Sequence, residues 1–225
     1  MRQRLIRSII LSVALVYYLR LPTEEDRQQQ NLAEPTREEF SRDMSRILPN
    51  SGSAVQSEMM AYITTENFLF PPGVALNQAV IVHVFVIVVS VATKIPLCTI
   101  GAPGQSKTLS FQIVLQNLQG SQLSLKQFCQ KLPAGDAFFY LGSKYSRPED
   151  IVAVFERAIK RERHYEQNQI NTRCVVFLGE TSLPDEKKMV LKVLHPYLDE
   201  CKVVFVAVSN KLFDAANANR RKCSV

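Results

Sequence analysis

An eight-residue stretch near the middle of the chain, Gly101–Thr108 (GAPGQSKT), constrains the fold more than any other feature. It follows the apolar run Ile95–Ile100 and precedes a segment of helical character, Leu109–Leu118. A strand, a glycine-containing loop, Lys-Thr and a helix, in this order, are the layout of a phosphate-binding loop. Backbone N–H groups of such a loop and of the helix N-terminus favour anionic oxygens. The stretch therefore predicts nucleotide binding, and an ordinary strand–turn–helix connection is the alternative.

Each residue type in this loop has an expected role. Gly101, Gly104 and Ser106 belong to the backbone that would surround the phosphates. Lys107 is expected to reach the β- and γ-phosphates, and the hydroxyl of Thr108 is expected to bind Mg²⁺. The match is imperfect, because the usual pattern has glycine at the position of Ser106.

Downstream of the loop, apolar strand-like runs alternate with helical segments. The expected strands and helices are Ala137–Leu141, Ile151–Tyr165, Cys174–Leu178, Lys187–Leu198 and Lys202–Val208. Ser146 and Glu149 form a capping-box pattern before the first of these helices. Strand–helix alternation predicts a parallel sheet covered by helices on both faces, with ligands at the carboxyl ends of the strands.

Three further positions complete the expected nucleotide chemistry. The strand Cys174–Leu178 ends in Gly179-Glu180, where one acid would hold Mg²⁺ through water and the next would polarise the attacking water. Glu180 is present, but the preceding acid is replaced by glycine. Asn210 follows the next strand and fits a residue that senses the γ-phosphate, and Arg220 fits an arginine finger. Individually, these residues are also explained as a strand end, a turn residue and a basic tail.

Composition excludes several other classes of function. The chain has 225 residues and a net charge of +6, but the charge is scattered, so nucleic-acid binding is not expected. The five cysteines form no C-x-x-C pair, and no histidine lies at metal-ligand spacing from any of them in the sequence, so no zinc finger or RING is expected. Cys98 and Cys174 lie in apolar runs, which favours free thiols in a reducing, intracellular compartment.

Two apolar segments imitate membrane elements. Leu5–Leu21 is interrupted by Arg7 and Arg20, and Ala79–Ala92 is only fourteen residues long. Because a span needs about 20 residues, we interpret both as core elements and expect no membrane span, with a membrane-anchored protein as a remote alternative. The longer run Val74–Thr93 fits either a strand or a buried helix.

At this point the chain resembles a known family. The residues that carry the resemblance are Phe70–Gln78, Lys94–Leu97, Gly101–Thr108, Leu191–Pro196, Val208–Asn210 and Asn219-Arg220. The resemblance is to the mysterin-like family of giant AAA-type ATPases and RING-type E3 ubiquitin ligases, and it covers roughly Phe68–Arg220. The family's loop also carries serine at the position of Ser106, so that deviation becomes support.

The resemblance implies an α/β fold of the P-loop NTPase AAA type, with a parallel sheet flanked by helices. The chain is expected to depart from the family in lacking the C-terminal helical lid. It implies that Val74–Thr93 is a helix and that residues 1–21 resemble the end of a preceding AAA module. Residues 22–67 would be a polar linker with a short helix around Arg37–Ile47, and residues 68–225 a truncated AAA core. The chain would then be a fragment or a truncated product that lacks the ligase's RING.

The resemblance also assigns roles to the residues already singled out. Lys107 and Thr108 would carry the phosphate and Mg²⁺ roles, Glu180 would be the catalytic glutamate, Asn210 the sensor and Arg220 the finger. The family has aspartate where this chain has Gly179, so ATP binding is expected to persist while hydrolysis is weakened or lost.

Partners and location follow from the same resemblance. The expected partners are other AAA modules of the same or a neighbouring chain, and the ubiquitin machinery only through a longer product, in the cytoplasm. The alternative is a non-hydrolysing structural or interaction module of the same architecture.

Overall fold

The computed structural model describes residues 11–13, 15, 17–24, 27–28, 33, 35–47, 54–181, 190–210 and 223–224. The chain divides into an N-terminal unit, residues 1–63, and a second unit, residues 64–224. The expected boundaries at residues 21 and 67 stay a prediction. Each unit is described by itself.

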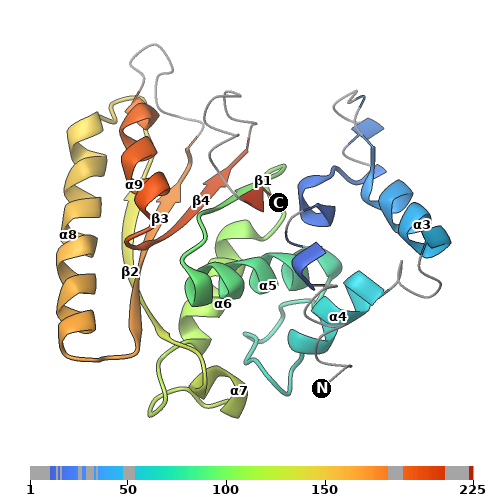
Figure 1. Cartoon of the computed structure of the whole chain (residues 1–225), viewed down its shortest axis with the longest axis horizontal. Coiled ribbons are helices and arrows are strands. Elements are labelled where there is room, and N and C mark those ends of the chain that lie inside the picture. Colours follow the sequence, from blue (N-terminus) through green and yellow to red (C-terminus); the bar gives the residue numbers. More distant parts are fainter. Residues whose placement is uncertain are drawn as a thin grey trace. The chain divides into compact units, whose positions relative to one another are not determined.

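A parallel sheet forms the centre of the second unit (Figure 1). Its strands are β1 (Leu97–Ile100), β2 (Ala134–Leu141), β3 (Thr172–Gly179), β4 (Val204–Ser209) and β5 (Cys223–Ser224). Their order is β2-β3-β4-β1-β5, and every pairing among them is parallel. This confirms the parallel α/β sheet predicted from the sequence.

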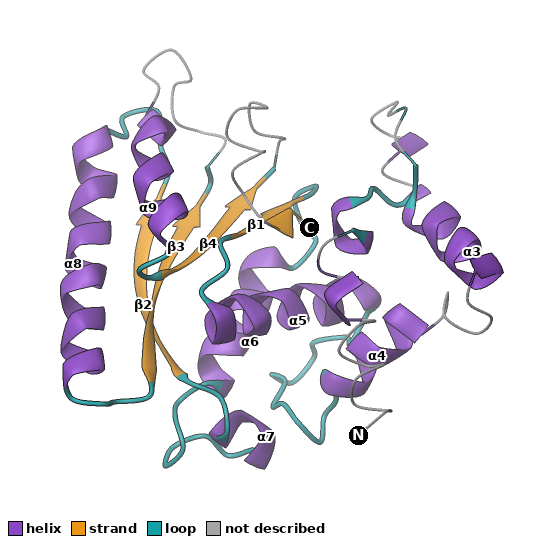
Figure 2. Cartoon of the chain, viewed as in Figure 1, coloured by secondary structure: helices purple, strands orange, loops and turns teal. Residues whose placement is uncertain are grey.

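Helices cover both faces of the sheet, as Figure 2 shows. The helical elements of this unit are α5 (Gln78–Thr93), α6 (Lys107–Asn117), α7 (Gln127–Gln130), α8 (Pro148–Gln167), the short 3-10 helix η3 (Val190–Val193) and α9 (Leu194–Glu200). Helices α8 and α9 lie on one face, and α5 and α6 lie on the other.

Because side chains alternate along a strand, the central strand β3 contributes to the cores on both faces of the sheet. On the α8 face, Val176 and Leu178 pack in a buried cluster with Phe155 and Phe205. On the other face, the ring of Phe177 stacks on Phe111 of α6, with 4.3 Å between their centroids.

The long apolar run before β1 is a helix, as the family resemblance implied. Helix α5 begins after Asn77, whose side chain accepts a hydrogen bond from the N–H of Val80 at 2.9 Å. It ends at Lys94, which takes the left-handed conformation with φ of 59°. Residues on all sides of α5 are buried, so its valines serve the core of this unit and burial overrides their strand propensity. No helix in the described part of the chain combines the length and apolar character needed to cross a bilayer.

The start of α8 corrects one prediction. The N-cap is Arg147, not Ser146, and the residue at the third helical position is Asp150, not Glu149. The carboxylate of Asp150 accepts a hydrogen bond from the N–H of Arg147 at 3.4 Å. The hydroxyl of Ser146 is used in the preceding turn, where it accepts from the N–H of Ser143 at 2.9 Å. Pro148 at the first helical position sets the boundary, because its fixed φ suits a helix start.

A buried charge cluster closes the amino edge of the sheet. Glu162 of α8 is 2% exposed, and its Oε1 lies 2.7 Å from Nζ of Lys94 and 3.3 Å from Nη1 of Arg173. Its Oε2 accepts a hydrogen bond from the N–H of Cys174 at 2.6 Å. Lys94 also donates to the carbonyl of Lys202 at 3.0 Å. This cluster therefore joins the C-terminus of α5, helix α8 and the starts of β3 and β4.

The described part of the N-terminal unit is helical. It contains residues 11–13 and 15, the 3-10 helix η1 (Tyr18–Arg20), α3 (Arg37–Ile47) and α4 (Ala54–Tyr62). The predicted short helix around residues 37–47 is thereby confirmed, whereas α4 was not predicted. Thr36 and Glu39 cap α3 reciprocally, because each side chain accepts from the other's backbone N–H, at 3.2 and 3.0 Å.

Candidate functional site at the carboxyl edge of the sheet

The candidate site lies where β1, β4 and β3 end, at one edge of the sheet (Figure 1). Backbone hydrogen bonds connect the chain segments that leave these strands. The N–H of Gly101 donates to the carbonyl of Ser209 at 3.2 Å, and the N–H of Thr181 donates to that of Val208 at 3.3 Å. Since β4 lies between β1 and β3, the residues after all three strands converge on this edge.

The predicted phosphate loop connects β1 directly to α6. Gly104 has a φ of +88°, which glycine adopts without steric cost. A Cβ on Gly101 would collide with Oε1 of Gln105, so glycine allows the Gln105 side chain to cross over this position. Ser106 also takes the left-handed conformation, with φ of 58° and ψ of 19°. This backbone geometry explains why glycine is usual at the position of Ser106, since a side chain there costs about 1–2 kcal/mol.

Lys107 is the first residue of α6 and is 5% exposed. Its Nζ donates to the carbonyls of Gly101 and Ala102, at 2.6 and 2.7 Å. Burial lowers the pKa of Lys107 below its ordinary value, and the negative charge of Glu180 opposes that shift. The ammonium group is thus held inside the loop, where an anionic oxygen could replace the two carbonyls as its partner.

Glu180 and Asn210 meet at the same edge. Nδ2 of Asn210 lies 3.4 Å from Oε2 of Glu180, although the two residues are 30 positions apart in the sequence. Glu180 has a φ of 51°, so the chain turns sharply as it leaves β3. The structure therefore brings Lys107, Glu180 and Asn210 to one place, as a nucleotide site requires.

Apolar side chains surround the position of Gly179, where the family has an acid. Gly179 is buried and pairs with Leu141 across β2 and β3. A Cβ on Gly179 would lie 2.7 Å from Cδ2 of Leu141 and 3.2 Å from Cε1 of Phe177. Apolar atoms thus lie where the first atom of an aspartate side chain would be.

The donors for Mg²⁺ are incomplete. Thr108 is exposed on the first turn of α6 and supplies one hydroxyl, while Gly179 supplies no side-chain oxygen. Sites for Mg²⁺ in nucleotide-binding proteins combine one or two carboxylates with phosphate oxygens. Among the residues that the structure describes, no cluster of three or more His, Cys, Asp or Glu side chains could hold a metal ion. The chain's own donors therefore do not fit a tightly held Mg²⁺.

Arg220 lies outside the described residues. Leu141 and Gln105 were not singled out from the sequence. Leu141 ends a predicted strand, and its position beside Gly179 follows only from the register of β2 against β3.

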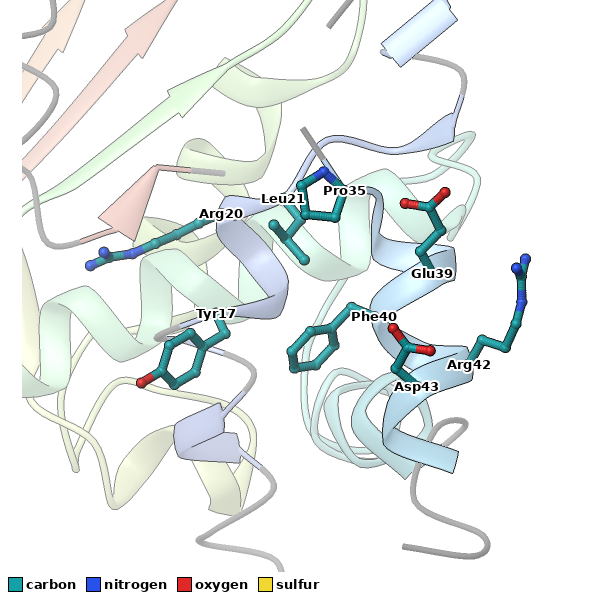
Figure 3. Close-up of a pocket in the computed structure, with 8 residues that line it drawn as sticks. All are labelled: Tyr17, Arg20, Leu21, Pro35, Glu39, Phe40, Arg42 and Asp43. Carbon is teal, nitrogen blue, oxygen red and sulfur yellow. The ribbon is translucent and has the colours of Figure 1, made fainter. Parts of the chain in front are cut away.

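A separate cavity of about 590 Å³ lies within the N-terminal unit (Figure 3). Its lining residues are Tyr17, Arg20, Leu21, Pro35, Glu39, Phe40, Arg42 and Asp43. None of the residues expected to bind nucleotide lines this cavity.

Comparison with known proteins identifies the family to which the chain is similar. A family model described as the RNF213 AAA domain matches residues 73–224. A protein of Dictyostelium discoideum whose name calls it a transmembrane protein is 34% identical over 157 residues, which is 67% of this chain and 3% of that protein. The E3 ubiquitin-protein ligase rnf213-beta of Danio rerio is 27% identical over 235 residues, 97% of this chain and 4% of the ligase.

The chain therefore spans only 3–4% of the length of these curated relatives. Among solved structures, that of C. elegans PCH-2 is similar over 71% of this chain and 44% of the PCH-2 chain, with a TM-score of 0.44 and 11% sequence identity. This likeness is too distant to add to the argument.

Proposed function

Since the chain belongs to the RNF213 AAA domain family, we propose that it is an ATP-binding AAA module in which hydrolysis is weakened or lost. In this proposal, Gly101, Gly104 and Ser106 supply the backbone around the phosphates, and Lys107 binds the β- and γ-phosphates. One observation carries the proposal. The buried ammonium of Lys107, the carboxylate of Glu180 and the amide of Asn210 come from three chain segments and lie at the same sheet edge.

The proposed weakness in hydrolysis rests on Gly179. In this proposal Glu180 would polarise water, and Asn210 would orient Glu180 or sense a γ-phosphate, roles that the contact between the two side chains supports. The hydroxyl of Thr108 is the metal ligand expected from the sequence, and it would contact Mg²⁺. Gly179 has no carboxylate that could hold the metal together with Thr108. A site that positions nucleotide but lacks a metal-holding acid is suited to binding more than to turnover.

The wider roles are also part of the proposal. Ubiquitin ligase activity, named for the Danio rerio relative, would belong to a longer protein. Other AAA modules of the same or a neighbouring chain would be the immediate partners, with Arg220 as a finger toward a neighbour's nucleotide. The completely buried thiols of Cys98 and Cys174 support a reducing compartment such as the cytoplasm.

ATP binding is tested by titrating the purified chain with ATP by calorimetry, beside Lys107→Ala and Lys160→Ala. Lys160 is an exposed lysine of α8 and serves as the matched control. We expect Lys107→Ala to weaken ATP binding at least about tenfold, because a charge-assisted contact is lost, and Lys160→Ala to bind like the wild type. Phosphate release by the wild type should be slow or absent, and therefore little or no faster than that of Lys107→Ala.

Wild-type affinity in Lys107→Ala would contradict the assignment of the loop. No ATP binding by the wild type would favour the alternative, a structural or interaction module without nucleotide. The specific observation behind that alternative is again the Leu141 side chain, because its Cδ2 lies 2.7 Å from where a Cβ at position 179 would be.

A further inference from the structure

We propose that nucleotide binding at this site is nearly independent of Mg²⁺, so that the module accepts a free nucleoside triphosphate as readily as its magnesium complex. The inference rests on the proposed ATP binding and concerns the ligand form that the same site takes. It arises from the disagreement between the metal expected from the family and the side chains that surround Gly179.

The position that should hold the metal shell has become apolar. Successive side chains of a strand point to opposite faces of the sheet, so residue 179 is on the same face as Phe177. This face is covered by α6, the helix that carries Lys107 and Thr108. A carboxylate at 179 would therefore project toward the first turn of α6. Cδ2 of Leu141 lies 2.7 Å from the place where the Cβ of such a residue would be.

Aromatic side chains lie on the same face of the strands as this position. Phe139 of β2 contacts Phe111 and Phe177, with ring centroids 5.9 and 5.7 Å apart. Together with Leu141, these rings form an apolar wall beside the end of β3. A hydrated cation gains little next to such a wall, because Mg²⁺ keeps several of its waters and is held in proteins by carboxylates together with phosphate oxygens.

The groups that can neutralise a triphosphate without metal remain in place. Lys107 is held in the loop by two carbonyls, and the N-terminus of the eleven-residue helix α6 adds backbone N–H groups and a favourable dipole. These contacts act on the phosphate oxygens directly and need no cation between protein and ligand.

Glu180 is the remaining carboxylate that could compensate for Gly179. It lies beyond the strand with a φ of 51° and accepts a hydrogen bond from Asn210. If Glu180 served as the metal-holding acid, wild-type binding would depend on Mg²⁺ and Glu180→Gln would lose that dependence. Comparison of the wild type with this variant therefore separates the two arrangements.

The experiment measures the affinity of the full chain for ATP in excess Mg²⁺ and in EDTA. We expect the two dissociation constants to agree within about threefold, or less than 1 kcal/mol, for the wild type and for Glu180→Gln. The double variant Gly179→Asp with Leu141→Ala restores the acid and removes the obstructing side chain, and in it Mg²⁺ should strengthen binding at least about tenfold. Leu141→Ala alone is the matched control and should behave like the wild type.

The outcomes are distinct. Wild-type binding that weakens more than about tenfold in EDTA overturns the inference and leaves the proposed ATP binding standing. Absence of ATP binding in both conditions overturns the proposed function and the inference with it. A double variant that unfolds at the same temperature as the wild type but stays independent of Mg²⁺ shows that position 179 is not the cause, and overturns the inference as well. Because Leu141 is 68% exposed, its side chain can be truncated at little cost to folding.

Discussion

Nδ2 of Asn210 lies 3.4 Å from Oε2 of Glu180, so the residues that follow β4 and β3 are in contact at the edge of the sheet. Burial lowers the pKa of Lys107 below its ordinary value, and the charge of this same carboxylate partly opposes that shift. Glu180 therefore acts on the phosphate loop through its charge as well as on any water that it would polarise. This electrostatic role can be measured through ATP binding alone, whether or not the chain hydrolyses ATP.

Replacing Glu180 with Gln should shift the pH dependence of ATP binding. Lys107 must be protonated to bind phosphate oxygens, so affinity falls as the pH rises through the pKa of Lys107 in the free protein. Removing the carboxylate lowers that pKa further, since Glu180 is the charge that opposes the effect of burial. We expect the alkaline loss of ATP binding to begin at a lower pH in Glu180→Gln, as measured by calorimetric titration across the alkaline range.

The control for this shift is Glu166→Gln, at the opposite edge of the sheet. Glu166 lies near the end of α8, its side chain is 54% exposed, and it pairs with Lys94. This variant should keep the wild-type pH profile. Identical profiles for wild type and Glu180→Gln would show that Glu180 does not influence Lys107.

Replacing Glu162 with Gln should destabilise the second unit. The substitution keeps the shape of the side chain but leaves Lys94 and Arg173 without their shared carboxylate. Removing one partner of a buried ion pair lowers the free energy of unfolding by about 3–5 kcal/mol, because the other charge stays buried without its partner. We expect a loss of about 3 kcal/mol in the free energy of unfolding, measured by urea denaturation.

Glu166→Gln is again the matched comparison, because it carries the same chemical change on the same helix. Its ion pair with Lys94 is at the surface, and such pairs contribute less than about 1 kcal/mol. Equal losses in the two variants would mean that the burial of Glu162 has no energetic consequence.

Alkaline pH should destabilise the fold partly through Cys129. Burial raises the pKa of its thiol from 9.0 to about 11, and the thiol donates to the carbonyl of Asn67 at 3.2 Å. Between these two pH values the unfolded chain releases the proton and the folded chain retains it, so stability falls as the pH rises. The contribution is fully present below pH 9 and is lost as the pH passes about 11.

Cys129→Ser isolates this contribution, since a hydroxyl can donate to Asn67 but does not ionise in this range. The urea midpoint should fall more steeply with pH in the wild type than in Cys129→Ser. Parallel slopes would indicate that Cys129 exchanges its proton equally in both states.

The elements of the second unit could be predicted because their local patterns agree with their environment. β3 reads as a continuous apolar run, as expected for a strand covered on both faces, and the loop Gly101–Thr108 predicted the order of strand, turn and helix. Even so, the start of α8 was misplaced. Ser146 and Glu149 have the spacing of a capping box, but Arg147 and Asp150 form the actual one, and Pro148 occupies the first helical position.

The environment of Gly179 could not be predicted in the same way. The sequence indicates that an acid is missing, but not what lies beside the missing side chain. That depends on the register of β2 against β3, which pairs Leu141 with Gly179. For Val74–Thr93, residue composition alone left helix and strand open, because burial on all sides removes the periodicity that distinguishes them.

The position of β4 between β1 and β3 has a consequence for how the site tolerates change. β1, which leads into the loop of Lys107, and β3, which ends just before Glu180, do not pair with one another. The distance between them is set by the one strand that lies between, and is about two strand spacings or 10 Å. That width comes from backbone hydrogen bonding, which is the same for every amino acid except proline. Substitutions among the buried residues of β4 can therefore change the stability of the sheet, while the distance between the ends of β1 and β3 stays the same.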